Sequence, residues 1–276
     1  RGLARNHRSV MNLQQLFALE ADGADTYVGE GLEYPWGGLY GGHIVAQALR
    51  AAAFTVTDEV LPHSLRAYFI RRGDNTQPVR YEVDRIRDGR SFGTRRVVAR
   101  QGESAILNLE ASFHRDETST DFAPIKHLQN IAQPDDIEET SWSSFLERRT
   151  LPTSLEHSRD GAGRTAAWLR VKDSLGNDEL LNRCALAYLS DDLPTESVVN
   201  AIPELHEASE AGKRFSASLD HTVWFHRPVR AEQWHLYEMS CVNYVNGRGL
   251  AHGYVFSQDG THVATVAQET LVRIAP

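Results

Sequence analysis

The sequence predicts an α+β protein built from two copies of one unit, each a mostly apolar helix followed by about four antiparallel strands. An internal repeat is the first observation, because residues 88–113 align with residues 246–271 without a gap, 158 positions apart (246 minus 88). Upstream, the run at 69–71 resembles the run at 225–227 at almost the same offset. Glycine-containing turn signals between strand-like segments are the second observation. A pseudo-symmetric molecule is therefore expected.

Composition and charge argue against several classes of protein. With 276 residues and 41% hydrophobic residues, the chain can bury one large core or two smaller ones. A net charge of −8 argues against a nucleic-acid partner. No apolar run approaches the roughly 20 residues of a membrane helix, and residues 1–15 lack the apolar region of a secretory signal. Two distant cysteines, Cys184 and Cys241, favour a reducing compartment and exclude a disulfide framework. We therefore predict a cytoplasmic protein.

The first copy, residues 1–115, is expected to contain one buried helix and four strands. The run from Gly42 to Phe54 is apolar on nearly every face, which indicates a buried helix. The glycines at 37, 38, 41 and 42 allow the backbone to approach another group closely just before this helix. Segments rich in Val, Ile, Phe and Tyr are the expected strands, at 63–70, 79–87, 92–100 and 105–113.

Residues 116–164 interrupt this pattern with prolines and acidic pairs. They are predicted to be a linker with one short helix around Trp142 to Arg148. The unit then recurs over residues 165–276, with a strand at 166–171 and a helix from about Asp178 to Ser190. The strands expected after that helix lie at 218–226, 234–245, 250–257 and 262–274.

Four motifs, in this order, resemble the TesB-like, type II acyl-CoA thioesterases. They are YGGHIVAQA at 40–48, HSLRAYFIRRGD at 63–74, RDGRSF at 87–92 and LDHTVWFHR at 219–227. The resemblance covers most of the chain, from about residue 10 to residue 275, and is weakest in the linker. It implies a double hotdog fold, in which two units of a helix wrapped by a curved sheet are fused in one chain.

The same resemblance implies hydrolysis of fatty acyl-CoA by a water molecule that an aspartate, a hydroxyl and a glutamine hold. Asp191 matches the aspartate in the run YLSD at 188–191, although Asp192 follows directly and a register error of one residue would exchange the two. Ser218 stands where the family typically has threonine, and Gln268 matches the glutamine near the C-terminus.

This residue set suits thioester chemistry, because a thiolate with a pKa near about 8.5 leaves with little acid help. Asp191 is expected to accept the proton of the attacking water, while Ser218 and Gln268 orient that water. A backbone N–H at a helix N-terminus would stabilise the oxyanion, and Gly42 is the expected donor. No metal or cofactor is expected, since coenzyme A is part of the substrate.

Other polar residues are interpreted as structural. The run GRSFG at 89–93 satisfies the pattern of a serine-hydrolase nucleophile elbow, but it lies in a predicted hairpin and Gly249 replaces Ser91 in the second copy. His63 and His221 each begin a strand with aromatic members, so packed histidines are expected. Glu110 aligns with Gln268, which predicts a single working site in the second copy.

Two other functions stay open. A hotdog enoyl-CoA hydratase would pair an aspartate with a histidine near the central helix, and His43 lies there without an aspartate close in sequence. A non-catalytic acyl-CoA-binding module is the other alternative, and the joint presence of Asp191, Ser218 and Gln268 argues against it. Sheets of this kind often associate further, so a homo-oligomer is expected.

Overall fold

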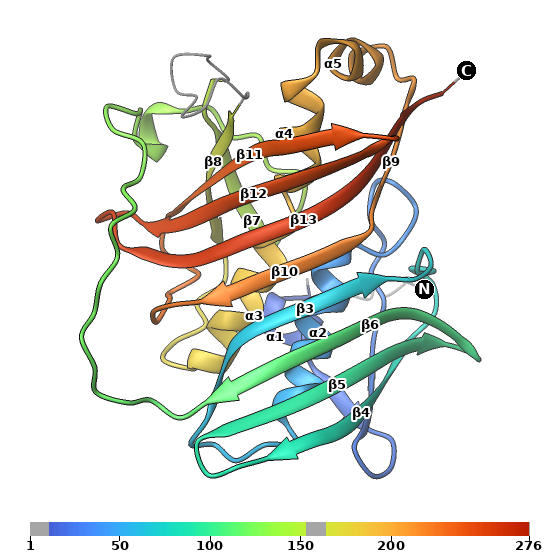
Figure 1. Ribbon diagram of the computed structural model, residues 1–276. Coiled ribbons are helices and arrows are strands. Elements are labelled where there is room, and N and C mark those ends of the chain that lie inside the picture. The colour runs from blue at the N-terminus through green and yellow to red at the C-terminus, as the bar shows by residue number, and fades with distance from the viewer. Residues whose placement is uncertain (1–10, 153–163, 276) are drawn as a thin grey trace, which may run out of the picture.

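The structure, a computed structural model that describes residues 11–152 and 164–275, contains one large antiparallel sheet with two central helices on the same face (Figure 1). The first half holds α1 (Leu13–Leu16), β1 (Leu19–Ala21), β2 (Thr26–Gly29), α2 (Gly41–Ala53), β3 (Leu61–Phe69), β4 (Val79–Asp88), β5 (Phe92–Gln101) and β6 (Ser104–His114). A single turn of 3-10 helix follows at Pro134–Asp136.

The second half repeats the plan with additions. It holds β7 (Leu146–Thr150), β8 (Arg164–Val171), α3 (Glu179–Ser190), α4 (Pro194–Ala201), α5 (Pro203–Glu210), β9 (Arg214–Ser218), β10 (Asp220–Phe225), β11 (His235–Val245), β12 (Arg248–Ser257) and β13 (His262–Ile274). In the described residues the strand order is β1-β2-β4-β5-β6-β3-β10-β13-β12-β11-β8-β7, with β9 paired to β13.

The two halves meet edge to edge at β3 and β10, whose antiparallel register runs from Asp220 opposite Tyr68 to Trp224 opposite Ser64. This junction makes one continuous sheet from two hairpin systems. It is the arrangement expected of two helix-in-sheet units fused in one chain.

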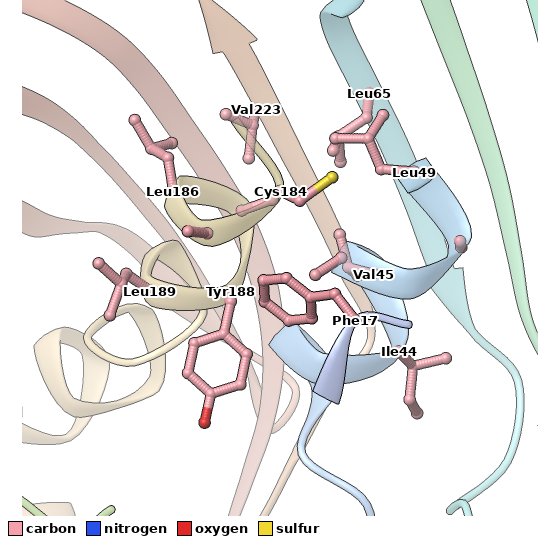
Figure 2. Close-up of a cluster of buried hydrophobic side chains, with 14 of the residues drawn as sticks. Phe17, Ile44, Val45, Leu49, Leu65, Cys184, Leu186, Tyr188, Leu189 and Val223 are labelled. Atoms are coloured by element: carbon pink, nitrogen blue, oxygen red, sulfur yellow. The ribbon is translucent and has the colours of Figure 1, made fainter. Parts of the chain in front are cut away.

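The core lies between this sheet and the paired helices α2 and α3 (Figure 2). Val45 and Leu49 of α2 and Cys184 of α3 are fully buried against the central strands. Val223 and Leu65, which face each other across the β3–β10 junction, complete the cluster. Each large aliphatic side chain buried in this way contributes roughly 1.5–3 kcal/mol, so the apolar pattern of the 42–54 run is explained by burial on all sides.

The linker is more structured than the sequence predicted, and the short helix expected around residues 142–148 is wrong. Residues 146–150 form β7, which pairs with β8 from Leu146 opposite Val171 to Thr150 opposite Ala167. Ladder hydrogen bonds to a sheet edge, formed by residues distant in sequence, override local helical preference here. Residues 153–163 of the predicted linker lie outside the described part of the chain.

Part of the linker also forms a second layer on the outer face of the sheet. Apolar side chains between residues 125 and 137 pack on Trp168, Leu236 and Phe256, and the indole N–H of Trp168 donates to the Ala132 carbonyl at 3.0 Å. This segment covers strands that would otherwise expose aromatic side chains to solvent.

The structure differs from the prediction in two further respects between α3 and β10. The strand predicted over 218–226 is two strands, β9 and β10, separated at Leu219. The helices α4 and α5 were not predicted, although each has a proline in its first turn, Pro194 and Pro203, which is a typical helix-start signal. Together α4 and α5 separate α3 from β9.

The gap-free alignment of the two copies fails in the last strand of each. Glu110 of β6 is exposed, whereas Gln268 of β13 is fully buried, so the two side chains lie on opposite faces of the sheet. The hairpin before β13 is longer than the hairpin before β6. The first is closed by a hydrogen bond from the Ser257 N–H to the Thr261 carbonyl, whereas in the second Gln101 pairs with Ser104. Glu110 is therefore not the counterpart of Gln268.

Candidate active site

Asp191 lies where the C-terminus of α3 meets the N-terminus of α2. It is the C-cap residue of α3, and its side chain is buried with 8% exposure. Its Oδ2 accepts a hydrogen bond of 2.8 Å from the backbone N–H of Gly42, in the first turn of α2. Unpaired N–H groups and the helix dipole at such a terminus favour a carboxylate.

The glycines at the start of α2 make this approach sterically feasible. A Cβ at Gly41 would lie 2.5 Å from Oδ2 of Asp191, and a Cβ at Gly42 would lie 2.3 Å from the Tyr188 carbonyl oxygen. Any side chain at either position would push the two helices apart. The glycine-rich entry therefore permits close contact between α2 and α3 at the buried carboxylate.

The same contact changes the expected role of Gly42. Its N–H, predicted to donate to an oxyanion, instead donates to Asp191. A single N–H aimed at the carboxylate is not available to a substrate oxygen while that bond is made. In this structure Gly42 orients the carboxylate rather than an oxyanion.

Ser218 and Gln268 converge on the same carboxylate from two adjacent strands. The Ser218 hydroxyl, at the end of β9, lies 3.5 Å from Oδ1 of Asp191 and donates toward it. The side-chain amide of Gln268, fully buried on β13, donates to the Ser218 hydroxyl at 2.9 Å. The structure thus brings together the three residues that the sequence proposed, in the order glutamine, serine, aspartate.

Burial raises the pKa of Asp191 to about 7, and the neighbouring charge of Asp192 acts in the same direction. Hydrogen bonding by Gln268, by the Gly42 amide and by Ser218 acts in the opposite direction. Desolvation is the larger effect, because it penalises the ionised form directly. A carboxyl group with a pKa near neutrality is suited to accept a proton at physiological pH.

Asp192, the alternative to Asp191 in the sequence, has a different environment. Its Oδ2 lies 3.1 Å from Nε of Arg148, and its Oδ1 accepts a hydrogen bond of 2.5 Å from the indole N–H of Trp142. Arg148 also pairs with Glu196 at 2.5 Å. The Asp192 carboxylate is thus held in a buried ion pair that anchors β7 to the end of α3, whereas the Asp191 carboxylate faces Gly42 and Ser218.

The two histidines that begin strands have different surroundings. His221 is fully buried, as predicted for a packed histidine, but it also contacts Gln268 and Ser190, a role that the sequence did not indicate. His63 is half-buried, and its Nε2 lies 2.8 Å from the Ser112 hydroxyl. Ser91 lies in the turn between β4 and β5, so it is not on a strand-to-helix elbow.

A cluster of aromatic side chains that the sequence did not single out lies where the N-terminus of α2 meets the C-terminus of α3. Tyr34, Trp36, Tyr40 and Trp142 form a contiguous set of ring contacts, and the Tyr40 hydroxyl donates to the Tyr188 carbonyl at 2.8 Å. A recess of about 370 Å³ is lined by residues that include Tyr34, Trp142 and Phe145. A larger recess of about 580 Å³ lies at the far end of α2, and none of the three site residues lines it.

Within residues 11–152 and 164–275, no group of three or more His, Cys, Asp or Glu side chains is arranged to hold a metal ion. Nor does any helix in these ranges combine the length and the apolar character that crossing a membrane would require.

Comparisons with known proteins agree on one family. The model of the acyl-CoA thioesterase N-terminal domain matches residues 32–114, and that of the acyl-CoA thioesterase C-terminal domain matches residues 124–272. Acyl-CoA thioesterase 2 of Haemophilus influenzae is 32% identical to the chain over 285 residues, which cover 96% of this chain and 98% of the relative.

Solved structures give the same result. An acyl-CoA thioesterase II, TesB2, from Mycobacterium marinum has a TM-score of 0.84 and 35% identity, and the match covers 95% of this chain and 98% of that one. A hot dog protein from Alicyclobacillus acidocaldarius has a TM-score of 0.77 over 96% of this chain and 98% of its own, at 21% identity. The predicted double hotdog fold is confirmed.

The raised pKa of Asp191 predicts that Asp191→Asn stabilises the fold at pH 8. A folded-state pKa of about 7, above the ordinary value of 3.8, means that the native state binds this proton more tightly than the unfolded state. Wild-type stability therefore falls as the pH rises from about 4 to about 7, and the neutral asparagine does not suffer this loss. Urea unfolding between pH 5 and pH 8 should show the advantage of the variant growing with pH.

Asp192→Asn is the matched control for this measurement. It removes the partner of the buried Arg148 guanidinium, so it should destabilise the protein across the same pH range. An Asp191→Asn variant less stable than wild type at pH 8 would contradict the assignment of a desolvated carboxylate.

Proposed function

Because the chain belongs to the TesB-like, type II acyl-CoA thioesterase family, we propose that it hydrolyses fatty acyl-CoA to free fatty acid and coenzyme A by direct attack of water. The observation that carries the mechanism is the convergence of Ser218 and Gln268 on the buried Asp191 carboxylate. The cytoplasmic location and the homo-oligomeric state stay predictions.

In this mechanism the ionised Asp191 removes a proton from water as the water oxygen bonds to the thioester carbonyl carbon. The carbon–sulfur bond then breaks, and the thiolate of coenzyme A leaves and takes up a proton. The pKa of about 7 supports this role, since a useful fraction of Asp191 is ionised at neutral pH and can still hold the proton transiently. Gln268 donates a hydrogen bond to Ser218, and Ser218 donates one to Asp191. This chain of donors fixes the orientation of the carboxylate and of the water that it holds.

The hydratase alternative is not supported by the surroundings of His43. Its Nδ1 lies 3.2 Å from the Tyr34 hydroxyl, and burial lowers its pKa to about 3. A histidine that faces a tyrosine in a buried site lacks the aspartate partner that hydration of an enoyl-CoA would need. The non-catalytic alternative would not require a carboxyl group held near neutrality by burial.

Asp191→Ala should lower kcat by about 100-fold or more and leave KM roughly unchanged, because a general base adds little ground-state binding. Coenzyme A release, followed with a thiol reagent, measures this for a saturated acyl-CoA, and the absorbance of an enoyl-CoA tests the hydratase reaction in parallel. Glu110→Ala, on the exposed face of β6, is the control and should change kcat less than about twofold. Near-normal turnover of Asp191→Ala would refute the mechanism.

Ser218 should tolerate threonine but not alanine, because the role requires a hydroxyl and nothing more. Ser218→Ala leaves the Gln268 amide without its acceptor, a loss of roughly 1–3 kcal/mol, so kcat should fall about tenfold or more. Ser218→Thr should keep most of the activity. Steady-state assays of both variants decide the point.

Ser91→Ala is the control for this pair of variants, since Ser91 lies in the β4–β5 turn, and it should hydrolyse substrate at the wild-type rate. Loss of activity in Ser91→Ala, or a covalent acyl adduct on either serine during turnover, would point to a serine nucleophile instead.

A further inference from the structure

We propose that His221 is a positioning residue that fixes the rotation of the Gln268 side-chain amide, so that its NH₂ group rather than its oxygen faces Ser218. This inference rests on the proposed function and deepens it. It assigns a role to a histidine that would otherwise be counted as core.

His221 lies between the end of α3 and the glutamine of the site. It is fully buried on β10. Its Nδ1 lies 2.5 Å from Oε1 of Gln268, and its Nε2 lies 2.8 Å from the hydroxyl of Ser190. Ser190 is the last residue of α3 and directly precedes Asp191, so the contacts close a ring from the aspartate through the histidine and the glutamine back to Ser218.

His221 and Ser190 each have one hydrogen to donate, so the rotation of the Gln268 amide decides which hydrogen bonds can form. Burial lowers the pKa of His221 to about 4, so the ring is neutral at pH 7 and carries one N–H. An amide oxygen only accepts, which places that hydrogen on Nδ1, and Nε2 then accepts from the Ser190 hydroxyl. In the structure the Ser190 hydroxyl donates to the Ala187 carbonyl at 3.0 Å, so its single hydrogen turns to Nε2 when this arrangement forms.

The reversed amide would disable the network. With the NH₂ group turned toward His221, the Gln268 oxygen would face Ser218 and would take the hydrogen of its hydroxyl. Asp191 would then lose its donor from Ser218. Both rotations fill the same space, so only the hydrogen bonds select between them. A hydrogen on Nδ1 of His221 favours the rotation that the structure has, and so does Asp191, which needs the hydrogen of Ser218.

The first copy of the unit shows which residues occupy the positions equivalent to His221 and Gln268 away from Asp191. Counting back four residues from the matching Phe69 and Phe225 reaches Leu65 in β3 and His221 in β10. Leu65 pairs across the sheet with Ala111, while the ladder of β10 and β13, which places Thr222 opposite Ala267, extends toward His221 and Gln268.

Two apolar side chains in one copy therefore correspond to two hydrogen-bonded polar side chains in the other. Burying polar groups costs free energy unless they are paired. The polar pair occurs in the copy whose strands adjoin Asp191, which links it to the site rather than to the fold.

Two substitutions of His221 distinguish a role as hydrogen-bond donor through Nδ1 from a role in packing alone. Asparagine places its NH₂ at the depth of Nδ1 and can still donate to Gln268, whereas glutamine reaches the depth of Nε2 and Ser190. We expect His221→Asn to keep kcat within about fivefold of wild type and His221→Gln to lower it about tenfold or more, the scale of one lost hydrogen bond. KM should stay unchanged in both, because the amide orients water rather than substrate.

His235 provides the matched control. It is also buried, on β11, and its Nδ1 lies 2.9 Å from the Gln233 carbonyl. His235→Asn and His235→Gln should leave kcat within about twofold of wild type while lowering the melting temperature, as we expect the His221 variants to do. Melting temperatures of all four variants report the general cost of replacing a buried histidine.

Equal values of kcat for His221→Asn and His221→Gln, whether both normal or both low, would overturn the positioning role. A rise in KM as large as the fall in kcat would overturn it as well. Failure of the proposed function is distinguishable, because it would appear as a wild-type protein that releases no coenzyme A from any acyl-CoA tested.

Discussion

The close approach of α2 and α3 at Asp191 is the constraint on which the rest of the site depends. Asp191 is the C-cap residue of α3, and its carboxylate accepts an N–H from the start of α2. This geometry exists only because Gly41 and Gly42 carry no side chain. Burial then raises the pKa of Asp191 to about 7. The continuous sheet holds both helices on one face and buries the carboxylate between them, so the core packing and the raised pKa of Asp191 have the same cause.

The two halves provide two similar ends of a helix pair, and the network of Gln268, Ser218 and Asp191 lies at one of them. The second copy gains α4 and α5 between α3 and β9, so Ser218 reaches Asp191 from a strand paired to β13. At the matching positions of the first copy, Leu65 and Ala111 are part of the apolar core. The pseudo-symmetry thus serves the fold, and the departures from it place the polar residues of the proposed site.

The sequence predicted the central helices and the long strands, and it singled out the three residues that the fold brings together, because helical apolar runs, hairpin turns and family motifs are local signals. It did not predict β7, because the partner strand β8 begins only at Arg164, well beyond β7 in the sequence. It also did not predict the exposure of Glu110, because the hairpins before β6 and β13 differ in length. It also missed the contact of His221 with Gln268. That contact depends on which face of each strand points inward, and a register difference of one residue reverses it.

A single turnover in water enriched in ¹⁸O, with enzyme in excess over acyl-CoA, tests most directly whether Asp191 acts as a base on water. If water attacks the thioester, the first fatty acid released carries one ¹⁸O atom and the protein gains none. If the Asp191 carboxylate attacks instead, the first product is unlabelled and the ¹⁸O appears in Asp191 after hydrolysis of the anhydride. Mass spectrometry of the fatty acid and of the peptide that contains Asp191 distinguishes the two. We predict label in the product alone, and label in Asp191 would contradict the account.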